Sequence, residues 1–207
     1  MVNAAAGVEV GTELVWEYVE DYKTPSIFVI NQMDHQKADY DAALEQIKNR
    51  FGSKVIPIQY PLNSGESFNQ IVDALRMVMY EFPATGGKPE KKPIPESEMA
   101  RANEMHNALV EMAAENEEGL MEKYFEEGNL SEEELAQGLM IGLAKHDFFP
   151  VFVASGAKDM GSGRIMGFID DIAPSPADRF GSKLENGEVL ACNAADKTTI
   201  FIYKTQS

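Results

Sequence analysis

Apolar positions in the first part of the chain alternate between helical and strand-like spacing. Residues 13–22 carry apolar side chains at mixed helical spacing, and residues 26–30 then form a short continuous apolar run. In residues 39–51 the apolar positions recur at i, i+3, i+4 and i+7, and Gly52 supplies a stop, which predicts an amphipathic helix. Residues 54–59 form a second apolar run. Such short runs are typical of strands buried on both faces, so the order predicts an α/β fold with a parallel sheet.

The pattern changes after residue 61 and becomes mainly helical. Residues 68–79 are half apolar and fit a helix or a strand, and residues 82–95 form a loop rich in Gly, Pro and Lys that we expect to be mobile. Two or three helices follow, the first over residues 97–115. A last helix begins at Ser131 with a capping-box pattern closed by Glu134, and it runs to residue 145.

The α/β pattern resumes towards the end of the chain. Residues 148–155 predict a buried strand, and after the Gly-rich turn GAKDMGSG a helix is expected over residues 164–172. Residues 177–196 are polar and predict a linker, and residues 198–204 have the β-branched and aromatic content of a strand. A chain that starts inside an α/β unit and ends by opening a new β element is interpreted as a fragment.

Composition and charge narrow the range of functions. The 207 residues contain 18 Lys and Arg against 34 Asp and Glu, for a net charge of −16, so direct binding to nucleic-acid phosphates is not expected. Most of the excess acid lies in residues 62–149, which hold 18 acidic and 7 basic side chains. The lone Cys192 predicts neither a disulfide nor a zinc site, and no signal peptide or membrane-spanning run is present. We therefore expect a cytoplasmic protein with no membrane contact.

The most informative motif is NQMD, at residues 31–34, directly after the apolar run of residues 26–30. An Asp carboxylate at this place, here Asp34, can accept both the ring N–H and the amino group of guanine, a pairing that adenine cannot make. The motif resembles the base-reading NKxD motif of GTPases, with Asn31 and Asp34 matching and Gln32 in place of Lys. The alternative is an ordinary turn between strand and helix in which Asn and Asp act as caps.

A second motif follows the buried strand predicted for residues 148–155. The sequence Ser155-Gly156-Ala157 resembles the second base-contacting loop of the same GTPases. That resemblance implies that the Ser hydroxyl steadies Asp34 and that a backbone N–H, which we assign to Gly156, points to the guanine 6-oxo group. The alternative is a tight turn built from small residues.

Longer stretches make the resemblance more specific. They are AAAGVEVGTELVW, FVINQMD, VIPIQYPL, the acidic run from PIPESEMARANEMHN to GNLSEEEL, PVFVASGAKDMGSG and IAPSP. Across residues 2–176 the chain resembles elongation factor G, the ribosomal translocase. The resemblance implies a partial Ras-like G domain of the P-loop NTPase class in residues 1–59 and 148–176, which lacks its first strands. It also implies an inserted acidic α/β subdomain in residues 60–147, and a linker with the first strand of a β-barrel domain in residues 177–207.

The resemblance also implies ligands and partners. The guanine of GTP or GDP would be read by residues of the two motifs: Asn31, Gln32, Asp34, Ser155, Gly156 and Ala157. The chain has no GxxxxGK[ST] loop, switch threonine or DxxPGH segment, so we expect no GTP hydrolysis by this chain alone and no Mg²⁺ ligands within it. The expected partner is the ribosome, where the C-terminal domain of the stalk protein would meet an acidic helical surface. Its candidate residues are Glu115, Glu117, Glu118, Glu122, Glu126 and Glu127.

The function implied for the intact protein is GTP-dependent movement of tRNA and mRNA through the ribosome. Gln32 leaves a second interpretation open, a regulatory or degenerate paralogue that binds the ribosome with weakened nucleotide dependence, since a shorter neutral side chain replaces the family's Lys. The opposite view, in which the stem of Gln32 still covers the base, remains equally open. A third interpretation is that the segment acts only as a stalk-binding module.

Overall fold

The computed structural model describes residues 1–178, 181–184, 186–193, 195–196, 198 and 200. Met1–Ala173 forms one compact unit, and Pro174–Ser207 forms a second, smaller one. Within the residues that are described, no helix is long and apolar enough to cross a membrane.

A four-stranded parallel sheet organises the larger unit. Its strand order is β1 (Val2–Asn3), β2 (Phe28–Asn31), β8 (Phe149–Val153) and β3 (Val55–Pro57). The pattern of helix and strand predicted this α/β architecture, and the prediction is confirmed. Strand β1 was not predicted, because two residues are too short to show any periodicity.

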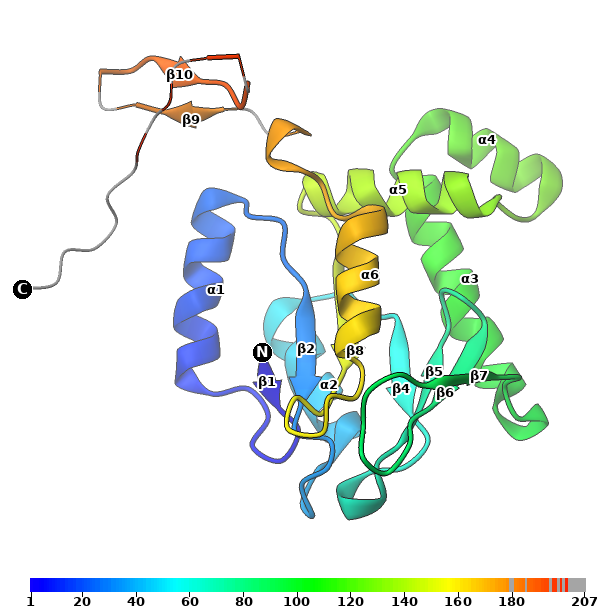
Figure 1. Ribbon diagram of the computed structural model, residues 1–207. Coiled ribbons are helices and arrows are strands. Elements are labelled where there is room, and N and C mark those ends of the chain that lie inside the picture. Colours follow the sequence, from blue (N-terminus) through cyan, green and yellow to red (C-terminus); the bar gives the residue numbers. More distant parts are fainter. Residues whose placement is uncertain (179–180, 185, 194, 197, 199, 201–207) are drawn as a thin grey trace, which may run out of the picture. The chain divides into compact units, whose positions relative to one another are not determined.

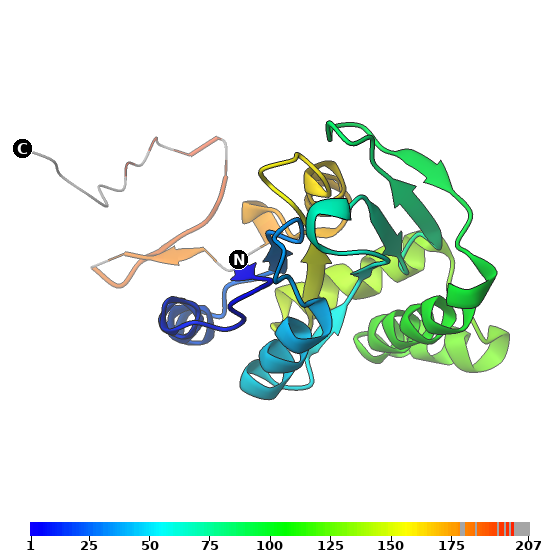
Figure 2. The same ribbon diagram turned by 90° about the horizontal axis from the view of Figure 1, so that it is seen from below.

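Helices cover both faces of this sheet. Helices α1 (Val10–Tyr22) and α2 (Tyr40–Phe51) lie on one face, and α6 (Ser162–Ile172) lies on the other (Figures 1 and 2). Asp39 caps α2 by accepting a hydrogen bond from the backbone N–H of Ala42 at 3.0 Å. The helices run close to the predicted positions, except that α1 begins three residues earlier than expected.

Strand β8 shows why its sequence is apolar throughout. Val151 and Val153 belong to the core cluster that includes residues of α2, whereas Phe152 belongs to the cluster that includes Phe168 of α6. Successive side chains of a strand point to opposite faces, and here both faces are covered. Each fully buried apolar side chain of this kind contributes about 1.5–3 kcal/mol to folding.

A second sheet is antiparallel and has the order β4 (Gln59–Pro61), β5 (Gln70–Asp73), β6 (Val78–Glu81) and β7 (Glu90–Lys92). Three expectations change here. The region of residues 68–79, which fitted a helix or a strand, contains β5 and the start of β6. The region of residues 82–95, predicted as a loop, contains β7. The single strand predicted over residues 54–59 is wrong, because β3 and β4 belong to different sheets.

Ile58 is the residue at which the chain passes from one sheet to the other. Its N–H donates to the carbonyl of Val151 at 3.0 Å, and its carbonyl accepts from the N–H of Ala74 at 2.9 Å. The two sheets are thus joined through one fully buried residue without a loop. An apolar run in the sequence cannot show which strand each residue pairs with, so it concealed this change of partner.

Three further helices follow the second sheet in the chain: α3 (Met99–Glu115), α4 (Glu118–Glu127) and α5 (Glu132–Ala144). The predicted capping box is confirmed: Ser131 Oγ accepts from Glu134 N at 3.3 Å, and Glu134 Oε2 accepts from Ser131 N at 3.0 Å. Helices α3 and α5 pack closely at Gly138, where a Cβ atom would lie 2.4 Å from the carbonyl oxygen of Ala113.

The smaller unit contains a 3₁₀ turn, η3 (Pro176–Asp178), and an antiparallel hairpin of β9 (Ser182–Lys183) and β10 (Val189–Leu190). The polar linker predicted for residues 177–196 therefore contains regular structure, which such short strands do not reveal in a sequence. The strand predicted for residues 198–204 lies outside the described residues apart from 198 and 200.

Candidate functional site

Two loops lie side by side at the carboxyl ends of neighbouring parallel strands. The NQMD loop (residues 31–38) follows β2, and the SGAK loop (residues 154–161) follows β8. The Met33 N–H donates to the carbonyl of Ala154 at 3.2 Å, and Met33 itself is fully buried. Ligands of open α/β sheets bind at this edge, where the loops of adjacent strands meet.

The central contact of the site joins Ser155 to Asp34. Ser155 Oγ donates to Asp34 Oδ1 at 2.7 Å across 121 residues of sequence. Ser155 is fully buried, and its backbone exchanges two hydrogen bonds with Met160, at 2.9 and 3.0 Å. Its hydroxyl also accepts from the Lys158 N–H at 3.3 Å. The serine is thus fixed in position and orients the carboxylate of Asp34.

Asn31 and Gly156 form a second link between the loops. The Gly156 N–H donates to Asn31 Oδ1 at 2.9 Å. This differs from our expectation that the Gly156 N–H points towards the guanine 6-oxo group. A backbone N–H requires an acceptor, and the side-chain carbonyl of Asn31 at the end of β2 is within reach. Ala157 is exposed in the turn that follows.

Gln32 takes part in a contact that the sequence did not reveal. Its backbone has a φ of 64°, and its Oε1 accepts from Asn3 Nδ2 at 2.8 Å. Asn3 Oδ1 in turn accepts from the N–H groups of Ala5 and Ala6, at 2.8 and 3.2 Å. Asn3 is therefore held by its own turn and tethers Gln32. An Asn followed by small residues at a strand end is the signal that could have indicated such a turn.

The glutamates expected to face the stalk protein lie elsewhere in the larger unit. Glu115 ends α3, while Glu118, Glu122 and Glu126 recur every fourth residue along α4, and all four are exposed. Glu134, on the neighbouring helix α5, differs from these glutamates because its carboxylate accepts hydrogen bonds from Lys123 and Ser131. A hydrogen bond from Lys123, with others from Ser131, lowers the pKa of Glu134 to about 2.

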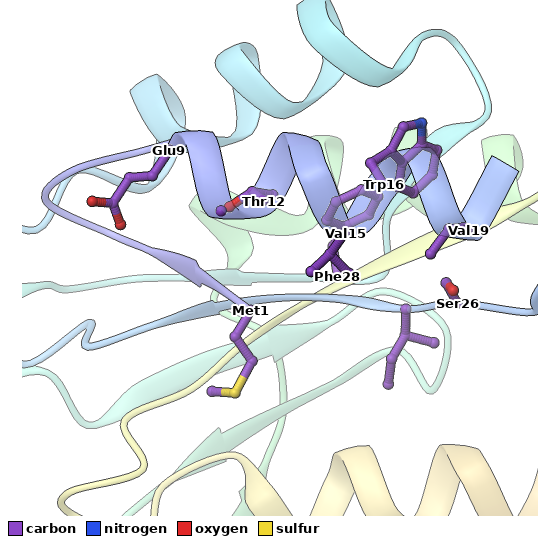
Figure 3. Close-up of a pocket in the computed structure, with 10 residues that line it drawn as sticks. Met1, Glu9, Thr12, Val15, Trp16, Val19, Ser26 and Phe28 are labelled. Carbon is purple, nitrogen blue, oxygen red and sulfur yellow. The ribbon is translucent and has the colours of Figure 1, made fainter. Parts of the chain in front are cut away.

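A separate pocket of about 450 Å³ lies between α1 and the beginning of β2 (Figure 3). Its lining includes Trp16 and Val19 from α1 and Phe28 from β2. The two loops lie beyond the opposite end of β2, so this pocket and the loops are distinct features. Among the residues that the structure describes, no three His, Cys, Asp or Glu side chains gather to hold a metal ion.

Comparison with known proteins identifies the family. Residues 1–175 match the family described as the elongation factor Tu GTP-binding domain. The chain belongs to this family. It is also 30% identical over 205 residues to an elongation factor G-like protein of Thermotoga maritima. The aligned region covers 98% of this chain and 29% of that protein.

A solved structure agrees with the family assignment. The crystal structure of a Thermus thermophilus protein resembles this chain with a TM-score of 0.77 and 30% identity, over 86% of this chain and 26% of that one. The chain thus spans less than a third of either relative. Membership of the family confirms the resemblance to an elongation factor G-like translational GTPase, and it implies binding of guanine nucleotides by the family domain.

Proposed function

We propose that the NQMD and SGAK loops read the guanine base of GTP and GDP in a translation factor that promotes movement of tRNA and mRNA through the ribosome. The observation that carries the proposal is the 2.7 Å hydrogen bond from Ser155 to Asp34. It holds one carboxylate of the NQMD loop at the sheet edge where a base would lie, as reading a ring N–H and an amino group requires. Such a factor works in the cytoplasm.

The other polar groups of the two loops suit the same ligand. The bond from Gly156 fixes the amide of Asn31 with its oxygen towards the SGAK loop, so Nδ2 is the side that can donate to a base. A guanine 6-oxo oxygen would share the Gly156 N–H with Asn31, and the Ala157 N–H follows in the same turn. In this proposal the phosphates and Mg²⁺ are held by parts of the intact protein other than these loops.

The same proposal assigns the segments. Residues 1–59 and 148–176 form part of the G domain, residues 60–147 form an inserted segment, and residues 177–207 lead into a β-barrel domain. The exposed glutamates of α3 and α4 lie in the inserted segment and form the surface for the stalk protein's C-terminal domain. Complementary charge at such a surface acts mainly on the rate of encounter.

The substitution Asp34→Asn tests the base assignment in the protein at its full natural length. The amide presents a donor where the carboxylate presented an acceptor, so it should repel the 2-amino group of guanine and accept xanthine, which has a carbonyl at that position. We expect GDP affinity to fall about 100-fold or more and xanthosine diphosphate to become the preferred ligand. The control is Asp170→Asn, on an exposed position of α6. Unchanged GDP binding by Asp34→Asn would reject the assignment.

The contact between Gln32 and Asn3 favours a second candidate function. It directs the Gln32 side chain to β1, whereas the family's Lys would pack on the nucleotide, and this suits a paralogue with weakened nucleotide dependence. Titration of fluorescent GDP against the full-length protein with Gln32 and with Gln32→Lys separates the two functions. Tight binding by both supports the GTP-dependent factor. Tight binding only with Lys supports the paralogue.

A further inference from the structure

The inserted segment reaches the NQMD loop through a short 3₁₀ turn, η1 (Gly65–Ser67). The Gly65 N–H donates to the carbonyl of Met33 at 2.8 Å. One residue further on, Glu66 Oε1 accepts from Gln36 Nε2 at 2.7 Å. Met33 lies between Asn31 and Asp34, so the first of these bonds holds the backbone that carries both base-facing side chains.

The same turn also holds the SGAK loop. Lys158 Nζ donates to the carbonyl of Glu66 at 2.9 Å. The backbone N–H of Lys158 donates to Ser155 Oγ at 3.3 Å, and Ser155 in turn donates to Asp34. A chain of contacts therefore runs from η1 through Lys158 and Ser155 to the carboxylate that would read guanine.

A second part of the inserted segment, the hairpin loop of residues 83–88, meets the SGAK loop from another direction. The Gly87 N–H donates to the carbonyl of Asp159 at 3.0 Å. Gly86 has a φ of +76°, and a Cβ atom there would lie 1.6 Å from the carbonyl oxygen of Lys158. Only glycine permits so close an approach of the two backbones.

We infer that η1 and the loop of residues 83–88 are positioning elements of the guanine site, and that Gly86 and Lys158 are the residues through which they act. This inference rests on the proposed function. Loops without regular structure lose precision unless other parts of the fold tie them down, and a base-reading site needs its donors and acceptors preorganised. The inserted segment supplies those ties, so any partner that shifts its sheet would also alter how the base is read.

Two neighbouring glycines give a matched test. Gly86→Ala and Gly87→Ala both place a side chain at positive φ, +76° and +90°, but an alanine Cβ at Gly87 has no atom within 4 Å. Backbone strain is therefore common to both variants. Only in Gly86→Ala does the new Cβ clash with the carbonyl oxygen of Lys158. The Gly87→Ala variant also keeps the N–H that bonds to Asp159.

The readout is the ratio of affinities for GDP and inosine diphosphate, measured with the full-length protein. Inosine lacks the 2-amino group, so the ratio reports how well Asp34 is placed, whereas a general loss of stability lowers both affinities alike. We expect Gly86→Ala to reduce the ratio about fivefold or more and Gly87→Ala to leave it within about twofold of the parent value.

Lys158 provides an independent variant. Lys158→Met keeps the apolar stem but removes the bond to Glu66, and it should reduce the ratio about threefold or more. Lys158→Arg restores a donor and should recover most of the loss. Lys88→Met, at an exposed lysine of the hairpin loop, is the control and should have no effect.

The outcomes separate this inference from the proposed function. If the parent protein does not prefer GDP to inosine diphosphate, the proposed function fails. The inference is then judged by exchange of the Gly156 amide in the ligand-free protein, which should become about tenfold faster in Gly86→Ala than in Gly87→Ala. If the parent prefers GDP and neither Gly86→Ala nor Lys158→Met changes the ratio, the inference is overturned and the function stands. If Gly86→Ala does not fold, Lys158→Met decides.

Discussion

Carboxylates occur in two contrasting settings within residues 60–147. Asp73, on β5, is fully buried and accepts hydrogen bonds from Gln59 Nε2 at 3.0 Å, Arg76 N at 2.9 Å and Arg164 Nε at 2.7 Å. The glutamates along α4 are exposed, on a helix at the outer edge of the unit (Figure 1). At Asp73, the fold places particular hydrogen-bond donors around one carboxylate. Along α4, the glutamates together give the surface a negative charge, and the exact position of each one matters less.

This contrast predicts how large the effect of a substitution is at each kind of carboxylate. A buried carboxylate that loses a charged partner is left in a medium that solvates it poorly, so one substitution has a large effect. On an exposed surface, water and salt replace a missing partner, so an effect requires several substitutions. Asp34 lies between these extremes, because it is partly exposed but held by the buried Ser155.

The largest expected effect is on stability, from Arg164→Met. Arg164 and Asp73 form an ion pair whose side chains are 10% and 0% exposed, and the variant leaves Asp73 without its cation. We expect the free energy of unfolding to fall by about 3–5 kcal/mol. Urea titration followed by circular dichroism measures it. The control Arg76→Met removes an exposed pair with Asp171 and should cost less than about 1 kcal/mol. Equal losses in the two variants would contradict the contrast.

The next largest effect is expected from Ser155→Ala, which should weaken ligand binding at Asp34, the partly exposed carboxylate. The variant removes a hydrogen bond to a carboxylate, which contributes about 1.5–3 kcal/mol, so GDP affinity of the full-length protein should fall about 10- to 100-fold. Fluorescent GDP titration measures it. Ser162→Ala is the matched control, since it removes a hydroxyl that bonds to Asp159 at 2.5 Å and not to Asp34. A loss of GDP affinity in the control as large as in Ser155→Ala would disprove the special role of Ser155.

A smaller effect is expected from the exposed glutamates. The triple variant Glu118→Gln, Glu122→Gln and Glu126→Gln should slow association with purified stalk C-terminal domain by about three- to tenfold at low salt. The difference should shrink as salt is raised, while thermal stability changes little. Stopped-flow measurement at two ionic strengths provides the test. An association rate independent of these charges would argue against this surface as the binding site.

The smallest effect concerns pH. The pKa of Glu134 is lowered to about 2 in the folded chain by hydrogen bonds from Lys123 and Ser131. Its stabilising contribution is therefore present in full above the ordinary pKa of 4.5 and is lost as the pH falls from there towards 2. Glu134→Gln should lower the melting temperature at neutral pH, and the difference from the parent should vanish in acid. The matched control is Glu133→Gln, at an exposed position of the same helix turn, which leaves the hydrogen bonds from Lys123 and Ser131 to Glu134 in place.

Local sequence signals predicted the helices well but resolved the strands less fully. The capping box at Ser131 and the stop of α2 at Gly52 were recognisable because they depend on residues within one turn. Strand β1, the passage between sheets at Ile58 and strand β7 were missed. Strand β1 and the passage at Ile58 are defined by partners far away in the chain, and no short-range pattern records them. Strand β7 pairs with its hairpin neighbour β6, but its three residues are all charged and show no apolar alternation.

The candidate site divides in the same way. The sequence by itself determined that Asn31 and Asp34 follow one buried strand and that Ser155 and Gly156 follow another, because apolar runs and motifs are local. Only the tertiary structure decided that the Gly156 N–H donates to Asn31 and that Asn3 donates to Gln32. It also decided that the backbone of Gly86 lies against the carbonyl of Lys158. These contacts join residues that are distant in sequence. They exist because parallel pairing of β1 with β2 and of β2 with β8 brings these residues to one edge of the sheet, where residues 65–67 and 83–88 pack against the two loops.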